Sequence, residues 1–337
     1  MLTLRRGTVT AIGERHDGLV RLEVDGRACV AYPDVTGPVA VGDDVLVNGQ
    51  AVELGLGSGG FDVLHANLTR GLGLPADAGA HVMKLPYTSL QHAVRHAEED
   101  AGAEPAALAG LPVVCCSLHS QVVPACAGLG GDVAVAYVQL PGGALPLPLS
   151  DVVRRLRQEG FLRTTVAVGP CFGGELACVS AASALLACAR AGMDAVVCGI
   201  GPGVVGTGTR HGHGGLAAAE AGNAAAALGG TPVLAPRLSE GDARERHRGL
   251  SHHTEAVLDL VRGPVVLAWP AGVEAPAGLP AVEVVDASGW REACAGLPLS
   301  HMGRGADEEA SFFAAAYAAG LLARRRLGRT AAGGPAA

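Results

Sequence analysis

The spacing of hydrophobic residues changes near residue 70. Residues 1–67 contain short runs in which apolar and polar side chains alternate, such as LVRLEVD and DDVLVN, separated by glycine, proline and aspartate. A period of two is typical of strands with one buried face. This pattern predicts a small antiparallel β-barrel over residues 1–70.

After residue 70 the apolar runs are continuous, and stretches with helical spacing separate them. Seven runs are expected to be buried strands: LPVVCCSL, DVAVAYVQL, RTTVAVG, DAVVCGI, TPVLAP, PVVLAWP and AVEVVDA. Helices are expected over residues 88–108, 151–159, 174–192, 214–229, 252–262 and 307–326. The alternation predicts an α/β domain over residues 71–326, with a mainly parallel sheet and helices on both faces, followed by a disordered tail over residues 327–337.

The composition limits the classes of partner. The chain has 337 residues and a net charge of −7, whereas a nucleic-acid or membrane-surface protein needs a basic face. The barrel segment also offers only Tyr32 and Phe61 for base stacking. The nine cysteines lie mostly in apolar runs, without a CxxC motif or a signal peptide, which favours reduced thiols. We therefore expect a cytoplasmic protein that binds neither nucleic acid nor membranes.

The C-terminal run EASFFAAAYAAGLLARRR is apolar but too short to cross a bilayer, and Gly320 is expected to interrupt it. We expect a packed helix here. An alternative is that this helix pairs with its copy in a second chain, which would make the protein a homodimer.

Glycine-rich and polar loops follow four of the predicted strands. In an open parallel sheet, ligands bind at the carboxyl ends of the strands, where loops lead into helix N-termini. The segment GPGVVGTGTRHGHGG offers the bare backbone of Gly206 and Gly208 and the hydroxyls of Thr207 and Thr209, and His119 stands at another such turn. One glycine loop indicates only a tight turn, but four on one edge favour a pocket.

The segment RERHRGLSHHT, residues 244–254, combines three arginines with three histidines. Ser251 is the predicted N-cap of a helix that has His252 and His253 in its first turn, and Arg246 and Arg248 precede it. Guanidinium groups, backbone amides and a helix terminus all attract anions. The alternative is a solvated basic loop that caps an ordinary helix.

We predict that RERHRGLSHHT and the loop at residues 206–209 form one pocket for a small anionic or phosphorylated ligand. In an enzyme, His119, His252 or His253 would act as acid or base near neutral pH. The alternative is a non-catalytic sensor or assembly protein whose barrel contacts a partner. The sequence identifies no cofactor and no substrate.

A metal site is a further alternative, because imidazoles suit zinc and iron. Five histidines could contribute to one: His119, His211, His213, His252 and His253. The chain has no HExxH motif, and the adjacency of His252 and His253 makes a shared ion awkward. We therefore assign no metal ligand.

The sequence lacks the motifs of several other common classes of enzyme. Lys84 is the single lysine, which excludes a Walker A loop. GPGVVGTGT is not a GxGxxG fingerprint, and GLGSGG is not a GxSxG nucleophile elbow. Cys171 stands at a strand-to-helix junction, where a packed thiol is the ordinary role.

Several long runs resemble one bacterial family: AYPDVTGPVAVGDDVLVN, AVELGLGSGGFDVLHANL, HVMKLPYTSLQ, GPGVVGTGT, ALGGTPVLAPRLS, RERHRGLSHHT and HMGRG. They resemble DUF3866, a family of uncharacterised proteins, from the first strand to about Gly320. The resemblance implies one continuous unit and selects the same loops, but it implies no activity. Other residue types are usual at His211, His213 and Cys171, which argues against a role for these three in a mechanism common to the family.

Overall fold

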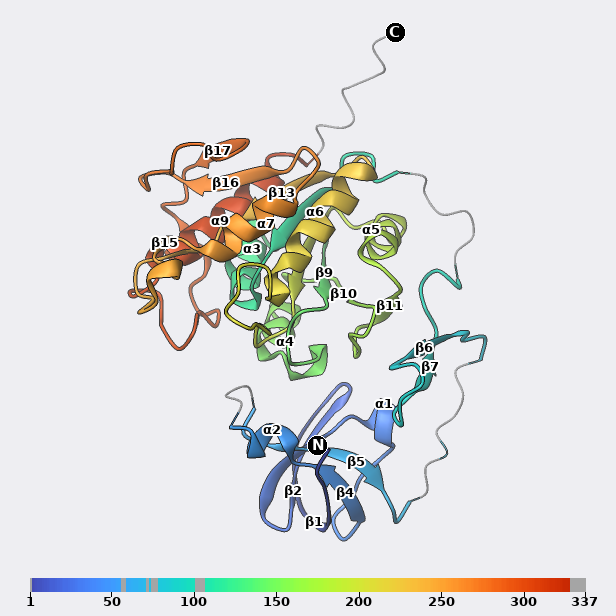
Figure 1. The fold of residues 1–337 in the computed structure, drawn as a ribbon. Helices are drawn as coiled ribbons and strands as arrows, with labels where there is room; N and C mark the ends of the chain where they lie inside the picture. Colours follow the sequence, from blue (N-terminus) through green and yellow to red (C-terminus); the bar gives the residue numbers. More distant parts are fainter. Residues whose placement is uncertain (1, 56–58, 71–72, 74–77, 101–106, 328–337) are drawn as a thin grey trace. The chain divides into compact units, whose positions relative to one another are not determined.

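The computed structural model describes residues 2–55, 59–70, 73, 78–100 and 107–327 (Figure 1). The chain divides into two compact units, Met1–Arg95 and His96–Ala337. The predicted disordered tail lies outside the described residues except for Leu327. The domain boundary at residue 70 stays a prediction.

The first unit contains a closed barrel in the strand order β1-β2-β3-β5-β4. Its strands are β1 (Leu4–His16), β2 (Leu19–Val24), β3 (Arg27–Ala31), β4 (Asp44–Asn48) and β5 (Asp62–Asn67). Four of the pairings are antiparallel, and β3 pairs with β5 in parallel. Alternate residues such as Val20, Leu22 and Val24 fill the interior, as the period of two predicts. The predicted barrel is confirmed.

Short elements complete this unit. They are α1 (Pro33–Thr36), α2 (Gln50–Glu53) and the hairpin of β6 (Val82–Lys84) and β7 (His92–Val94). The helix expected over residues 88–108 is wrong for the described residues 88–100, which hold β7 and turns. Val94 pairs with Val82 across the hairpin, and this pairing overrides a weak helical spacing.

The second unit is built on an eight-stranded parallel sheet in the order β11-β10-β9-β12-β8-β13-β16-β17. Its strands are β8 (Pro112–Cys116), β9 (Val135–Leu140), β10 (Thr164–Val168), β11 (Leu176–Cys178), β12 (Ala195–Ile200), β13 (Thr231–Ala235), β16 (Val266–Pro270) and β17 (Val282–Val285). Each of the seven predicted runs contains a strand. Strand β11 replaces the start of the helix expected over residues 174–192.

Helices cover both faces of this sheet, as predicted. They are α3 (Val122–Leu129), α4 (Asp151–Gln158), α5 (Ala181–Arg190), α6 (Ala217–Ala227), α7 (His252–Leu260), α8 (Trp290–Ala293) and α9 (Ala310–Arg324). Along β8, Val113 and Cys115 join a core with α5, α6 and α7, whereas Val114 and Cys116 join a core with α3, α4 and α9. The continuous apolar strands are therefore buried on both sides.

Four short 3₁₀ turns and one small hairpin connect these elements. They are η1 (His119–Gln121), η2 (Leu147–Leu149), η3 (Gly214–Leu216), η4 (Glu245–His247) and the hairpin of β14 (Leu238–Ser239) and β15 (Gly249–Leu250). Helix α9 packs closely on α3. A Cβ atom added to Gly320 would lie 2.1 Å from the carbonyl oxygen of Ala125. The interruption predicted at Gly320 is wrong: α9 is continuous through this residue, and the missing side chain permits the close approach to α3.

The connections after two neighbouring strands run to opposite faces of the sheet. Strands β8 and β12 are neighbours, yet β8 leads to α3 on one face and β12 leads to α6 on the other. Where connections diverge in this way, the loops separate and leave room for a ligand. The loops after β8, β12 and β13 surround this point.

Candidate functional site

The loop after β12 is a glycine-rich turn that holds its own shape. The amide of Thr207 donates to the carbonyl oxygen of Gly212 at 2.8 Å, and the hydroxyls of Thr207 and Thr209 are 3.1 Å apart. Gly208 has a φ of 82°, which favours glycine. The structure shows no hydrogen bond from the amides of Gly208 and Thr209 within the described residues, and both residues are exposed. The amide of Thr207, by contrast, is already bonded to the loop itself.

Ser251 caps helix α7, as predicted from the sequence. Its hydroxyl oxygen accepts a hydrogen bond from the amide of His253 at 3.2 Å and lies 2.7 Å from Nδ1 of His247. Ser251 is fully buried. The cap thus fixes the start of the helix and the ring of His247 together.

The two arginines predicted to bind an anion lie in different places. A Cβ atom added to Gly208 would lie 3.7 and 3.9 Å from the terminal guanidinium nitrogens of Arg246. Arg246 is exposed and has no carboxylate partner in the part of the chain that the structure describes. Arg248 instead donates from Nε to the carbonyl oxygen of Asp242 at 3.0 Å and lines a cavity with Leu238 and Trp269. The structure therefore brings Arg246, but not Arg248, to the glycine-rich loop.

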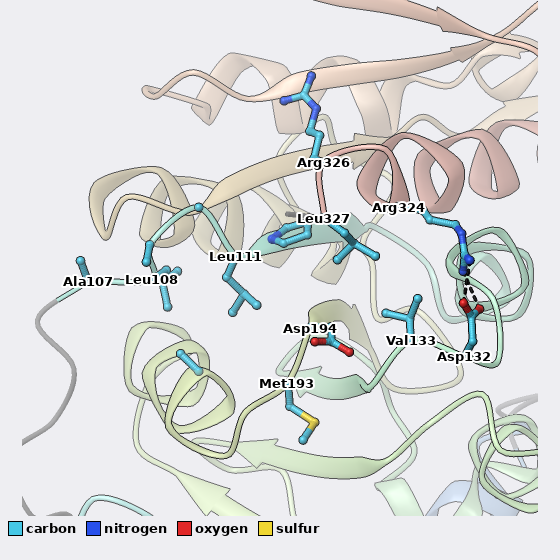
Figure 2. Close-up of a pocket in the computed structure, with 14 residues that line it drawn as sticks. Ala107, Leu108, Leu111, Asp132, Val133, Met193, Asp194, Arg324, Arg326 and Leu327 are labelled. Atoms are coloured by element: carbon cyan, nitrogen blue, oxygen red, sulfur yellow. Dashed lines mark hydrogen bonds and ion pairs between the residues drawn. The ribbon is translucent and has the colours of Figure 1, made fainter. Parts of the chain in front are cut away.

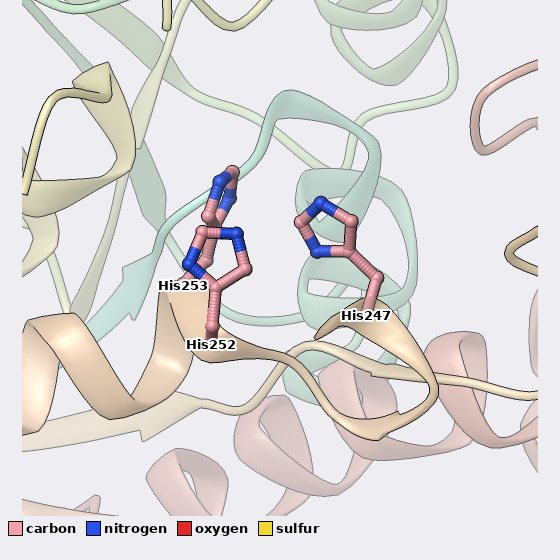
Figure 3. A group of neighbouring side chains, drawn as sticks. All are labelled: His247, His252 and His253. Carbon is pink, nitrogen blue, oxygen red and sulfur yellow. The ribbon is translucent and has the colours of Figure 1, made fainter. Parts of the chain in front are cut away.

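Four imidazole rings form a cluster beside the glycine-rich loop, where His213 lies against Gly206. Figure 3 shows three of these rings. The rings of His213 and His253 stack with centroids 3.8 Å apart, and those of His252 and His253 are 4.5 Å apart. The ring of His247 lies 4.7 Å from that of His252 and 4.9 Å from that of His253. His252 is half-buried, and the other three are buried. We call these four residues the histidine cluster.

The histidine cluster is uncharged at neutral pH. Burial lowers the pKa of His213 to about 4, that of His247 to about 3 and that of His253 to about 2. Burial and then the charge of Arg246 lower the pKa of His252. Neutral rings keep one nitrogen lone pair each, so they can accept a proton or bind a metal ion.

A buried ionic network lies beside the cluster, after β13. The guanidinium of Arg237 donates to Asp242 at 3.1 Å and to Nδ1 of His253 at 3.2 Å. Hydrogen bonds from Arg244, followed by its charge and that of Arg237, hold the pKa of Asp242 well below its usual range. Burial lowers the pKa of Arg237 to about 10, which leaves it charged. This arginine keeps a fixed positive charge next to His253.

The model of a family described as "Protein of unknown function (DUF3866)" matches residues 27–320. The chain belongs to DUF3866. The match includes the glycine-rich loop, the histidine cluster and Arg237, and the description of the family names no activity. A comparison with curated proteins gave no match. None of the described helices of this DUF3866 protein has both the length and the apolar character needed to cross a membrane.

Two of the histidines considered from the sequence lie apart from the cluster. His119 contacts Ser150 Oγ at 2.8 Å through Nε2 and the carbonyl oxygen of Ile200 at 3.1 Å through Nδ1. Burial lowers its pKa to about 4, and both ring nitrogens have protein partners. His211 is exposed, with Nε2 3.1 Å from Asp259. Of the predicted acid–base residues, the structure brings only His252 and His253 together.

Several buried polar atoms near the cluster have no hydrogen-bond partner within the described residues. They are both ring nitrogens of His213, Nε2 of His252, Nε of Arg237, Nε2 of His301 and Oε2 of Glu309. The ring of His301 is fixed by Ser120, whose Oγ is 3.0 Å from Nδ1, and by stacking on Phe312. Buried polar atoms are nearly always paired, so this concentration of unpaired ones is unusual and makes this part of the sheet edge the candidate site.

The residues that sequence analysis missed are His247, Arg237, Asp242, His301 and Glu309. His247 stands inside the run RERHRGLSHHT, and its spacing of four residues from Ser251 was the available signal. Arg237 follows directly after a predicted strand, which is the position from which side chains reach a sheet's carboxyl edge. For Glu309, buried and bonded to Ser239 at 2.8 Å, the sequence carries no local signal.

A large cavity lies at the opposite edge of the sheet (Figure 2). It has a volume of about 720 Å³ and is lined by Pro112, Val133 and Asp194, at the amino ends of β8, β9 and β12. Its carboxylates are already paired, because Asp132 binds Arg324 and Asp194 accepts from the amide of Ala134. We therefore place the candidate site at the carboxyl edge.

Proposed function

We propose that this DUF3866 protein binds a small anionic ligand, such as a phosphorylated or carboxylated metabolite, at the carboxyl edge of its parallel sheet. The ligand would lie between Arg246 and the amides of Gly208 and Thr209. The observation that carries the proposal is the position of the Arg246 guanidinium over Gly208, without a carboxylate partner among the described residues.

The strength of such a site follows from its parts. A hydrogen bond that involves a charged group contributes about 1.5–3 kcal/mol, so a guanidinium and two amides together support micromolar binding. Arg237, paired with Asp242 and facing His253, adds positive charge nearby. The neighbouring histidines are neutral, so they do not balance the positive charges of these arginines. An anionic ligand would balance them.

The histidine cluster supports an enzyme more than a passive binding protein. Arg246 is close enough to His252 to lower the pKa of its ring, so a ligand held by Arg246 lies near that ring. Nε2 of His252 is buried without a partner, whereas Nδ1 of His253 is already bonded to Arg237. His252 is therefore the residue of this pair that has a nitrogen free to act on the ligand.

A thermal-shift screen of anionic metabolites tests the proposal. The wild-type protein and the variants Arg246→Gln and Arg248→Gln would be compared with phosphate, nucleotides, sugar phosphates and carboxylates. A ligand at about 100 times its Kd adds about 2.7 kcal/mol to stability. We expect this gain to be lost in Arg246→Gln and kept in the matched control Arg248→Gln.

An equal response in the two variants would show that the anion binds elsewhere. Once a ligand is known, His252→Gln separates an enzyme from a binding protein: an enzyme loses turnover and keeps affinity. A ligand that binds and is never converted would favour the non-catalytic alternative.

A further inference from the structure

We propose that His247, His252 and His253 bind one divalent transition-metal ion of the zinc type. Each of the three rings offers a nitrogen, and these three nitrogens all lie within 4.8 Å of one another. The three residues come from one stretch of seven residues, at the end of η4 and the start of α7 (Figure 3). The inference does not depend on the anion site, because a metal ion can bind in the absence of any other ligand.

The three rings must move closer together to form a zinc site. Zinc binds imidazole nitrogen at about 2.0–2.1 Å in a tetrahedral arrangement, so two nitrogens on one ion lie about 3.4 Å apart. The three nitrogens here lie within 4.8 Å of one another, so binding of an ion must draw them together by up to about 1.4 Å. His252 is half-buried and is the ring with the most room to turn.

Adjacent histidines are compatible with one ion here because of the helix cap. Ser251 has an extended backbone and His252 begins the helix, so the chain turns sharply at this point. The rings of His252 and His253 meet at 69° rather than pointing to opposite sides. The awkwardness expected from sequence is thus relieved by the position of these residues at the first turn.

The surroundings of the rings resemble those of metal ligands in general. Nδ1 of His247 lies 2.7 Å from the hydroxyl of Ser251, which orients the ring and leaves Nε2 for an ion. Nε2 of His252 is buried and has no partner in the described residues.

Several arginines near the rings oppose a cation: Arg244 and Arg246 act on single rings, and Arg237 is hydrogen-bonded to one of them. A guanidinium only donates, so Nδ1 of His253 accepts its hydrogen bond and the ring proton is on Nε2. When a metal binds, this ring must either turn or move its proton to Nδ1, and the contact with Arg237 is then lost. The paired carboxylate of Asp242, 3.1 Å from Arg237, partly offsets the positive charge.

Three protein ligands leave a fourth position for water or an anion, as in catalytic zinc sites. His213 stacks on His253 at 3.8 Å and covers one side of the ligand set. His252 is the ligand nearest to solvent, on the side where Arg246 lies. An ion bound here would have its open coordination position on the side of Arg246.

Metal titration of the full-length chain tests this inference. The protein would be stripped with a chelator, dialysed, and titrated with Zn²⁺ and with Co²⁺ by calorimetry and visible absorption. We expect one ion per chain and a Co²⁺ spectrum of nitrogen and oxygen ligands. His247→Ala, His252→Gln and His253→Ala should each weaken binding at least about 100-fold, because loss of even a supporting contact costs about 10–100-fold.

His211→Ala is the matched control, since His211 is exposed and paired with Asp259. It should leave the affinity unchanged. Far-ultraviolet circular dichroism of each metal-free variant checks the fold, and half-buried His252 is the position where substitution disturbs it least. Absence of stoichiometric binding, equal affinity in His252→Gln, or a thiolate charge-transfer band from the cysteines would overturn the inference.

Discussion

At the scale of single residues, the site depends on histidines that are kept neutral. His247 and His253 are buried, and the guanidinium of Arg237 lies beside them, so a protonated ring would be both desolvated and repelled. Such rings offer lone pairs over the whole physiological pH range. The cost is a native state that tolerates acid poorly.

This cost leads to a prediction about stability and pH. Histidines of the unfolded chain titrate near pH 6.5, whereas the pKa is about 3 for His247 and about 2 for His253 in the folded state. Below pH 6.5 the unfolded state therefore binds more protons, and the free energy of unfolding falls as the pH decreases. Each such ring contributes about 1.4 kcal/mol per pH unit in this window.

Urea unfolding at about pH 7.5 and about pH 5.5 measures this effect. His247→Gln should have a smaller pH dependence than the wild type, and His211→Gln, which alters an exposed ring, should match the wild type. A free energy of unfolding that stays constant between the two pH values would contradict a neutral buried cluster.

At the scale of elements, the cap of α7 connects stability to the site. Ser251 accepts the amide of His253 at 3.2 Å and contacts Nδ1 of His247 at 2.7 Å, so one hydroxyl supports both the helix and the cluster. Ser180 caps α5 in the same way, by accepting the amide of Ser183 at 3.2 Å, but touches no part of the site. The two serines form a matched pair.

We predict that Ser251→Ala and Ser180→Ala each lower the free energy of unfolding by about 1–2 kcal/mol. Only Ser251→Ala should also weaken binding of the metal or the anion, because only it releases the ring of His247. Chemical unfolding and ligand titration of both variants provide the two readouts. A Ser251→Ala protein that is destabilised yet binds as well as Ser180→Ala would show that the cap has no role in the site.

The elements themselves were predictable where the chain carries a strong local pattern. The seven buried strands of the sheet are continuous apolar runs, which few other structures explain. Strand β11 was missed because it has only three residues and pairs only with β10. The helix expected at residues 88–108 failed because the hairpin of β6 and β7 depends on pairing between segments, which spacing alone does not reveal.

At the scale of the whole molecule, the location of the site follows from topology. The connections after β8 and β12 diverge to opposite faces, and the loops that sequence analysis selected after these strands meet there. Loop position could be predicted because every parallel strand ends at the same edge. The hydrogen-bond partners of the site residues could not be predicted. Glu309, for example, bonds to Ser239 across 70 residues of sequence, and such pairs form only in the folded chain.

The different positions of Arg246 and Arg248 could not be predicted from the sequence either. Both flank His247 in one basic run, and nothing in the sequence separates them. Their side chains diverge because η4 ends between them: Arg246 reaches Gly208, and Arg248 turns to Asp242. The sequence thus predicts the segment, and the fold determines which residue faces the loop.

A crystal structure of the protein soaked in inorganic phosphate would locate the anion. We expect density for it within hydrogen-bond distance of the Arg246 guanidinium and of the amides of Gly208 and Thr209, at the carboxyl edge of the sheet. Phosphate bound only at other positions, such as beside Arg248, or an Arg246 side chain that stays without an anion at saturating phosphate, would contradict the proposed anion site.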